Sequence, residues 1–171
     1  MQMEISSSNS LSIQTPLGYL KLIADNHHLV SASFITPSES NNDNNVSPLL
    51  KEVAAQMDAY FTGKLQTFDI PLQPHGTDFQ KEVWKKLLTI PYGETISYLK
   101  LANMVGGSNY SRAVGTANGN NPIAIIIPCH RVIGNNGNLV GYSGGLEKKQ
   151  WLLDFEKKCK YGILELFGRG F

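Results

Sequence analysis

NPIAIIIPCHRVI, residues 121–133, is an apolar run that ends on a thiol and continues at once with an imidazole. A continuous apolar run of this length predicts a buried strand, with Cys129 at its end. On an extended backbone the side chains of Cys129 and His130 point to opposite faces, so a contact relayed through water is more natural than a direct one. Because the thiolate is the nucleophilic form of cysteine, chemistry at Cys129 would require that its thiol be activated.

The residues before this run have the spacing of a helix-turn-helix. Apolar positions predict a helix over Leu99–Val105, glycines follow at 106 and 107, and a second helix is predicted from Tyr110 to about Asn118. The second helix carries Arg112 among small side chains, and no acidic residue occurs from Ile96 through Gly134. This composition favours close approach to a polyanion. The spacing alone is a weak signal, because many helix pairs separated by glycines never touch DNA.

The first part of the chain predicts a small sheet with one helix. Alternating apolar and polar residues over 11–35, with turn-forming residues at 24–26, predict an antiparallel hairpin. A polar loop over 38–45 leads to a predicted helix over 48–61, and an extended run over 67–72 predicts a last strand. The apolar positions of that helix are Leu49, Val53, Met57 and Tyr60.

Proline and glycine within residues 74–77 discourage helix and mark a linker. We therefore expect an α+β protein of two domains, residues 1–73 and residues 76–171. Asp78 is the expected N-cap of the first helix beyond the linker, which ends before the turn signal at 91–93. The expected apolar stripe of this helix is Phe79, Val83, Leu87 and Leu88, with Trp84 packed beneath it.

The chain has 171 residues, 42% of them hydrophobic, and a formal net charge of +1, which predicts a folded protein rather than a disordered one. The charge is unevenly divided. Residues 1–75 hold three Lys and seven acids, for −4, whereas residues 76–171 hold twelve basic residues and seven acids, for +5. A polyanion should prefer the second half, although such an imbalance also arises by chance on solvated surfaces.

Cellular location and metal binding follow from what the sequence lacks. No run approaches the roughly 20 apolar residues of a membrane helix, and the N-terminus has no basic start or apolar segment, so we expect an intracellular protein without membrane contact. Cys129 and Cys159 are too few for a disulfide framework or a Cys-rich zinc site. His27, His28 and His75 have no cysteine partner before residue 129, so no metal is expected. We expect no role for Cys159.

The motif around Cys129 resembles the Pro-Cys-His-Arg signature of the O6-alkylguanine-DNA alkyltransferases, the methylated-DNA–protein-cysteine methyltransferase family. The resemblance extends over the whole chain. It implies a small N-terminal α/β domain, ribonuclease H-like with a sheet and a helix, and a mainly helical C-terminal domain with a winged-helix-like helix-turn-helix. The further family motifs are Phe79-Gln80, Val83-Trp84, Ile90-Pro91-Tyr92-Gly93, Ser97-Tyr98, Ser111-Arg112-Ala113-Val114-Gly115 and Gly141-Tyr142-Ser143-Gly144-Gly145-Leu146.

The activity implied by this resemblance is direct-reversal DNA repair. The alkyl group of O6-alkylguanine in double-stranded DNA moves irreversibly to Cys129, with O4-alkylthymine as a further candidate substrate. In the family a glutamate, a histidine and a water remove the thiol proton, and Glu156 and His130 occupy the matching positions. The thioether offers no acyl group for water to hydrolyse, so this S-methyltransferase would act once per molecule. The resemblance implies a cytoplasmic monomer, or a nuclear one in a eukaryote, without a cofactor.

The resemblance also assigns contacts to the damaged base. The Tyr98 hydroxyl would act near N3 of the guanine, and the main-chain amide of Ser143 would act near O6. The carbonyl groups of Cys129 and Val132 would accept from the exocyclic amine, which selects guanine without any side chain. Tyr142 would form a wall of the pocket.

The base must leave the duplex to reach the thiol, at a cost of about a few kcal/mol. By resemblance Arg112 fills the vacated place in the base stack, and Tyr98 helps to rotate the nucleotide outward. The recognition helix would dock in the minor groove with little sequence preference. The remaining assignments are Ser111, Ala113 and Ala117 as DNA contacts, Asn121 as a hinge between this helix and the active-site strand, and Arg131 as a structural residue.

Two other functions fit parts of the pattern. An alkyltransferase-like protein would bind an alkylated base without repairing it, but such a protein typically has another residue in place of Cys129. A cysteine hydrolase would use Cys129 and His130, but it needs an oxyanion hole and gives no role to Arg112. Transfer to Cys129 accounts for more of the sequence than either alternative.

Overall fold

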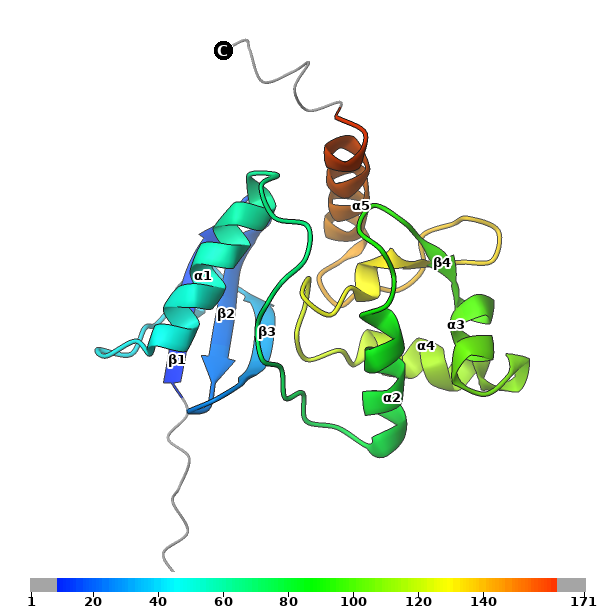
Figure 1. Cartoon of the computed structure of the whole chain (residues 1–171), viewed down its shortest axis with the longest axis horizontal. Helices are drawn as coiled ribbons and strands as arrows, with labels where there is room; N and C mark the ends of the chain where they lie inside the picture. The colour runs from blue at the N-terminus through cyan, green and yellow to red at the C-terminus, as the bar shows by residue number, and fades with distance from the viewer. Residues whose placement is uncertain (1–8, 163–171) are drawn as a thin grey trace, which may run out of the picture. The chain divides into compact units, whose positions relative to one another are not determined.

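The computed structural model describes residues 9–162, and contacts divide the chain into two units. The first unit contains the residues through His75 together with Pro122–Ala124. The second contains Gly76–Asn121 and the residues from Ile125 onward. Both units are drawn in Figure 1.

The sheet of the first unit has three antiparallel strands in the order β1-β2-β3 (Figure 1). They are β1 (Asn9–Thr15), β2 (Gly18–Ala24) and β3 (Leu29–Ile35). The prediction of a two-stranded hairpin over residues 11–35 is therefore wrong, because this segment forms three strands. The alternating pattern was correct, but it continued through a turn that the sequence interpretation missed.

The missed turn lies between β1 and β2 and is closed by a threonine. The Oγ1 atom of Thr15 accepts from the Leu17 amide at 3.1 Å and donates to the Gly18 carbonyl at 2.7 Å. Gly18 has a φ of +106°, which a residue with a side chain rarely adopts. A hydroxyl that satisfies the backbone in this way makes a tight turn without the usual Asn-Gly or Asp-Gly pair.

One helix, α1 (Pro48–Phe61), packs on this sheet and has the predicted bounds. Ser47 caps it by accepting from the Leu50 amide at 3.3 Å, and proline follows at the first helical position. Its buried stripe begins at Leu50 and not at the predicted Leu49, which is only half-buried. The buried side chains are Leu50, Val53, Met57 and Tyr60.

The predicted strand over residues 67–72 does not form. Within it the structure has only a single parallel bridge, between Leu72 and Leu29 on the outer edge of β3. A second single bridge joins Ala32 of β3 to Ile123. Pro71 has no amide hydrogen for a ladder, which explains why extended residues here fail to become a strand.

The second unit is mainly helical (Figure 1). A helical unit that follows a sheet with one covering helix is the α+β organisation predicted from the sequence. The helix-turn-helix consists of α3 and α4, which are joined by a 3₁₀ turn at Ser108–Tyr110. The other elements are a short parallel pair of strands and two helices. The bounds are α2 (Asp78–Leu87), β4 (Ile96–Ser97), α3 (Tyr98–Val105), α4 (Ser111–Gly119), β5 (Val132–Ile133) and α5 (Leu146–Lys160).

Helix α2 begins with a capping box that differs from the prediction. The N-cap is Thr77, not Asp78, because its side chain accepts from the Gln80 amide at 3.1 Å while the Gln80 side chain accepts from the Thr77 amide at 2.9 Å. The predicted stripe is also one residue too long, since Leu88 is 48% exposed. Trp84 is buried as predicted, and its indole N–H donates to the Ala117 carbonyl of α4 at 2.8 Å.

Gly76 leaves the space that Trp84 and the capping box fill. A Cβ atom at Gly76 would lie 2.5 Å from Cη2 of Trp84 and 2.7 Å from Oε1 of Gln80. Because both side chains are held by hydrogen bonds, we expect Gly76→Ala to lower the free energy of unfolding by about 1–3 kcal/mol. Urea denaturation measures this effect. Gly119→Ala is the matched control, with open space around its Cβ. Equal stability of the two variants would contradict the prediction.

Candidate active site

Cys129 does not stand at the end of a strand. It begins a 3₁₀ turn, Cys129–Arg131, and the preceding residues 124–127 form turns and bends. The predicted strand is therefore wrong, and so is the argument that an extended backbone separates the side chains of Cys129 and His130. An apolar run flanked by prolines has the composition of a buried strand, and periodicity alone does not distinguish it from a buried turn.

The turn before Cys129 has a strained backbone. Ile125 has a φ of +72°, the only positive φ among the described non-glycine residues. A β-branched side chain in this region costs about 1–2 kcal/mol. The side-chain amide of Asn121 donates to the Ile127 carbonyl at 2.7 Å and so closes the turn. Cys129, which follows this turn, is only 4% exposed.

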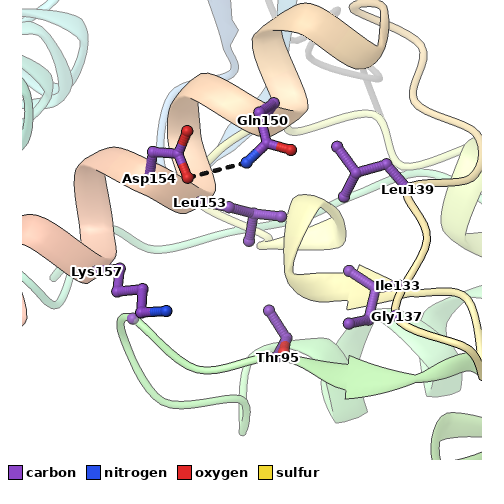
Figure 2. A pocket seen from close by; sticks show the side chains of 9 residues that line it. Thr95, Ile133, Gly137, Leu139, Gln150, Leu153, Asp154 and Lys157 are labelled. Atoms are coloured by element: carbon purple, nitrogen blue, oxygen red, sulfur yellow. Dashed lines mark hydrogen bonds between the residues drawn. The ribbon is translucent and has the colours of Figure 1, made fainter.

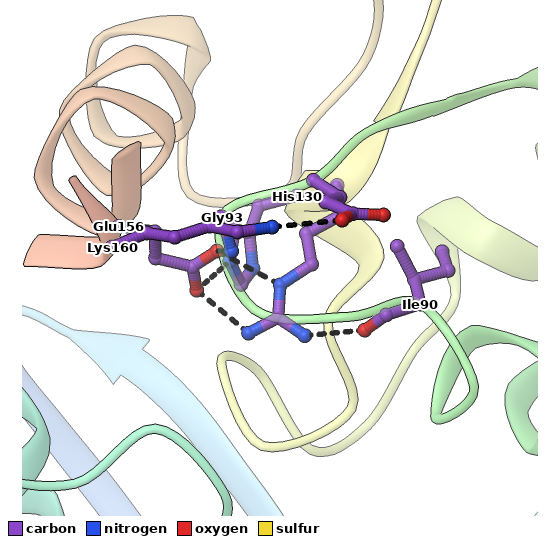
Figure 3. A network of polar contacts seen from close by, with 7 residues as sticks. Ile90, Gly93, His130, Glu156 and Lys160 are labelled. Atoms are coloured by element: carbon purple, nitrogen blue, oxygen red, sulfur yellow. Dashed lines mark hydrogen bonds and ion pairs between the residues drawn. The ribbon is translucent and has the colours of Figure 1, made fainter. Parts of the chain in front are cut away.

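A buried carboxylate on α5 organises the residues after Cys129 (Figure 3). Oε1 of Glu156 lies 2.8 Å from Nε2 of His130 and accepts from Nη2 of Arg131 at 2.9 Å. Oε2 accepts from Nε of Arg131 at 2.8 Å and from the Gly93 amide at 3.3 Å. Arg131 also donates to the Ile90 carbonyl at 2.7 Å. Both oxygens of the carboxylate therefore accept hydrogen bonds from protein groups.

These contacts determine which groups carry charge. Burial raises the pKa of Glu156, but the hydrogen bonds from His130 and Arg131 and the positive charge of Arg131 outweigh burial and hold this pKa well below its usual range. Burial lowers the pKa of His130 and outweighs the opposite effect of Glu156, so the imidazole is neutral. The buried pair of charges is therefore Glu156 and Arg131.

The tautomer of His130 follows from its carboxylate partner. An ionised carboxylate only accepts, so Nε2 carries the hydrogen that points to Glu156. Nδ1 of a neutral ring then has a free lone pair. This atom is buried and has no hydrogen-bond partner within residues 9–162. Nδ1 of His130 is thus able to receive a proton from an acid nearby, directly or through a water.

The Cys129 thiol needs such a base. Burial raises its pKa, and the Asn121 side chain and the charge of Lys149 only partly offset this effect. A buried thiol with a raised pKa is poorly nucleophilic until its proton is removed. Removal of the thiol proton would therefore have to precede any attack by Cys129.

Lys149 is a site residue that sequence reasoning missed. It is fully buried on α5, and its Nζ donates to the carbonyls of Val140 at 2.9 Å and Gly141 at 3.3 Å. Burial lowers its pKa to about 8, against a smaller opposite effect of Cys129. A lysine on an amphipathic helix normally lies in solvent, so nothing in the local pattern distinguished it from Lys148.

Tyr98 is the first residue of α3, and Ser97 caps the helix by accepting from the Lys100 amide at 3.0 Å. The hydroxyl of Tyr98 donates to the Val140 carbonyl at 3.0 Å. Burial raises the pKa of this phenol, so it remains protonated and can donate a hydrogen bond. The 3.4 Å distance from its oxygen to Nδ2 of Asn118 connects it to the interior of α4.

The remaining residues predicted to contact DNA or the damaged base differ in their exposure. Arg112 and Ala113 are exposed on α4, and Ser111 is half-buried. The prediction that Ala117 contacts DNA is wrong, because it is 2% exposed and lies against Trp84 on the inner face of the helix. Ala117 follows Arg112 by five residues, so the two side chains point to different sides of α4. Val132 is buried, Tyr142 is half-buried with a buried hydroxyl, and Ser143 is exposed.

A separate cavity is lined in part by α5 residues between Gln150 and Lys157 (Figure 2). It contains neither Cys129 nor His130, so it is not the site of the thiol chemistry. Its lining is mixed in polarity and comes from α5, the end of β5 and the loops beside β4. The lining residues are Gly93, Thr95, Ile133, Gly137, Leu139, Gln150, Leu153, Asp154 and Lys157.

Residues 9–162 contain neither a cluster of metal-binding side chains nor a membrane-spanning helix. No three histidine, cysteine or acidic side chains gather closely enough there to hold a metal ion. No helix in that range is long and apolar enough to cross a membrane.

Two family profiles match the chain. Residues 78–158 match the profile described as 6-O-methylguanine DNA methyltransferase, DNA binding domain. Residues 11–74 match the profile described as 6-O-methylguanine DNA methyltransferase, ribonuclease-like domain. Together the matches span both units and agree with the fold class predicted from the sequence.

Individual relatives match over nearly their whole length. The methylated-DNA–protein-cysteine methyltransferase of Mycobacterium bovis is 45% identical over 159 residues, which cover 91% of this chain and 96% of the relative. The protein of the same name from Methanosarcina acetivorans is 45% identical over 152 residues, which cover 85% of this chain and 96% of the relative.

Solved structures of similarly named proteins also match most of the chain. The structure of Mycobacterium tuberculosis OGT in complex with DNA has 44% sequence identity and a TM-score of 0.80, with 88% of this chain and 93% of that chain covered. An O6-methylguanine DNA methyltransferase from Methanococcus jannaschii has 30% identity and a TM-score of 0.64, with 86% and 93% covered.

Proposed function

The chain belongs to the 6-O-methylguanine DNA methyltransferase family, and from this membership we propose that it repairs O6-alkylguanine in DNA by taking the alkyl group onto Cys129. The observation that supports this role best is the buried Glu156–His130 pair, in which Nδ1 of the imidazole is free to accept a proton. The thiol that precedes it in sequence is the nucleophile such a base would activate.

The proposed step moves one proton and exchanges one bond. His130 takes the Cys129 proton through a water, and Glu156 stabilises the imidazolium that forms. The thiolate attacks the alkyl carbon, a carbon–sulfur bond forms, and the carbon–oxygen bond breaks with its electrons going to guanine. Tyr98 donates a hydrogen bond to the departing base. In net terms guanine gains the proton that the thiol lost.

The same chemistry makes the reaction single-turnover. The product on Cys129 is a thioether, and no group in the site makes a thioether sulfur a leaving group toward water. A hydrolase would instead form a thioester that water can open. We therefore propose a stoichiometric methyltransferase that needs no cofactor.

The helix-turn-helix supplies the contact with double-stranded DNA in this proposal. Arg112 is exposed on α4. In this proposal its side chain enters the base stack when the alkylated guanine turns outward, and Ser111 and Ala113 contact the sugar-phosphate backbone of the DNA. Val132 and Ser143 contact the base through their main chains, and further site residues are Tyr142 and the hinge Asn121. We also propose that the protein acts as a cytoplasmic monomer with domains at 1–73 and 76–171.

Intact-mass measurement tests the proposed function. After incubation with duplex DNA that contains one O6-methylguanine, the protein should gain one methyl group, and peptide mapping should locate it on Cys129. Cys159→Ser is the matched control and should still be methylated. Tight binding without a mass change would favour a lesion-binding protein, and repeated ester hydrolysis would favour a hydrolase.

Arg112→Ala should separate base flipping from chemistry. The variant loses the side chain that replaces the flipped base, so we expect methyl transfer from duplex DNA to slow by about 10- to 100-fold, the equivalent of one to a few kcal/mol of unstacking. Reaction with the free alkylated base should stay near the native rate, because no flipping is required. Rapid-quench measurement on both substrates checks this. Equal losses on both would contradict the flipping role.

A further inference from the structure

Asn118 occupies a position between the two reacting parts of the site. It lies on the inner face of α4 and is 2% exposed. Its Nδ2 donates to the hydroxyl oxygen of Tyr98 at 3.4 Å and to the carbonyl oxygen of Cys129 at 3.3 Å. A carbonyl only accepts, so the second contact fixes which end of the amide carries the nitrogen.

We propose that Asn118 is a positioning residue for alkyl transfer, which sets the Tyr98 proton donor relative to the backbone of the nucleophile. This inference rests on the proposed function. One amide nitrogen contacts both groups, so a shift of Tyr98 away from Cys129 breaks at least one hydrogen bond. Both contacts are long for N–H···O bonds, as is common for catalytic hydrogen bonds before a substrate is bound.

The direction of the hydrogen bonds also makes Tyr98 a stronger donor. The hydroxyl accepts from Asn118 and donates to the Val140 carbonyl, and a hydroxyl that accepts one hydrogen bond donates a second one more strongly. Burial raises the pKa of Tyr98, whereas the contact with Asn118 lowers it. If a flipped base takes the place of Val140, the strengthened hydroxyl hydrogen then points to that base.

Stability alone does not explain an amide at this position. Oδ1 of Asn118 is buried and has no hydrogen-bond partner in the described part of the chain. An unsatisfied buried acceptor is destabilising, and an apolar side chain of the same size would avoid this cost. The favourable contacts of this side chain come from its Nδ2 atom, which holds the two groups that act on the substrate.

Two reactions of the same thiol distinguish positioning from structure. Methyl transfer from O6-methylguanine has a poor leaving group that needs a proton donor. Alkylation of Cys129 by iodoacetamide releases iodide, which needs none. A variant that only misplaces the proton donor should slow the first reaction and not the second, whereas a variant that distorts the thiol should slow both.

The experiment compares native protein, Asn118→Leu, Tyr98→Phe and the double variant. We expect Asn118→Leu to slow methyl transfer by about tenfold and to change the iodoacetamide rate at Cys129 by less than about twofold. In the Tyr98→Phe background Asn118→Leu should have an effect below about twofold, because the donor it serves is already absent. Asn120→Ala, an exposed position on the same helix end, should match the native protein in both reactions.

Equal slowing of both reactions, or full multiplication of the two effects in the double variant, would overturn this inference. Asn118→Ala gives the same comparison if the leucine variant does not fold. Failure of the proposed function has a different signature, since native protein would then leave Cys129 unmethylated. Native methylation with no selective loss in the Asn118 variants rejects only the positioning role.

Discussion

Cys129→Ser is expected to abolish methyl transfer while affinity for DNA stays within about twofold of the native protein. A serine hydroxyl is a much weaker acid than a thiol, so the neutral His130 cannot generate the alkoxide, and burial disfavours that anion further. The side chain is 4% exposed, so its replacement by a close isostere leaves the exposed surface of α4 unchanged. Intact mass follows transfer, and fluorescence anisotropy with a labelled duplex follows binding.

The two readouts together identify what Cys129 does. Methylation of the Cys129→Ser variant would mean that another residue accepts the methyl group. Cys159 would be examined first because it is the other free thiol. Loss of both transfer and binding would indicate that the substitution disturbs the α4 surface. Only loss of transfer with retained binding fits a nucleophile that lies behind a separate DNA-binding face.

Much of the secondary structure could be predicted because it depends on local spacing. Helix α1 has the predicted bounds, and the bounds of α3 and α4 differ from the predicted ones by one residue at most. Caps and strand counts were less accurate, since a hydroxyl such as that of Thr15 or Thr77 decides between neighbouring registers that have similar composition. These errors are small in sequence and do not change the fold class.

From the sequence, only those site residues could be predicted whose side chains themselves react or transfer a proton. Cys129, His130 and Glu156 come from a motif and a matching position, and the structure brings the last two within 2.8 Å. Asn118 and Lys149 were missed because their importance arises from burial and from long-range contacts with carbonyl groups. The sequence around a polar helix residue does not predict that its side chain is buried.

The same limit explains why Ala117 was placed on the wrong surface. The sequence interpretation grouped small side chains near Arg112 and treated smallness as a sign of close approach to DNA. Small residues serve equally well where two helices pack closely, and the indole of Trp84 bonds to the Ala117 carbonyl at such a contact. Composition therefore identified the helix but not which of its faces meets the ligand.

Glu156→Gln is expected to lower the free energy of unfolding by about 3–5 kcal/mol, because it leaves the charge of Arg131 buried without an anionic partner. For a chain of this size that corresponds to a melting temperature lower by roughly 10 °C. Methyl transfer by the folded fraction should slow by about 100-fold or more, since the imidazolium of His130 loses its stabilising charge. Thermal unfolding and single-turnover rates measure the two effects. Asp154→Asn, an exposed acid on the same helix, should change neither.

The pH dependence of stability should show the same pair of groups. The pKa of Glu156 is depressed by folding, so its contribution is present above its ordinary value of 4.5 and is lost as the pH falls toward the folded pKa. The pKa of His130 is also lowered, so the unfolded chain binds a proton first as the pH falls below 6.5. Native stability should therefore decline below pH 6.5 and decline more steeply below 4.5. In Glu156→Gln the decline below pH 4.5 should become shallower, and a variant with the native acid profile would show that the carboxylate is not the group responsible.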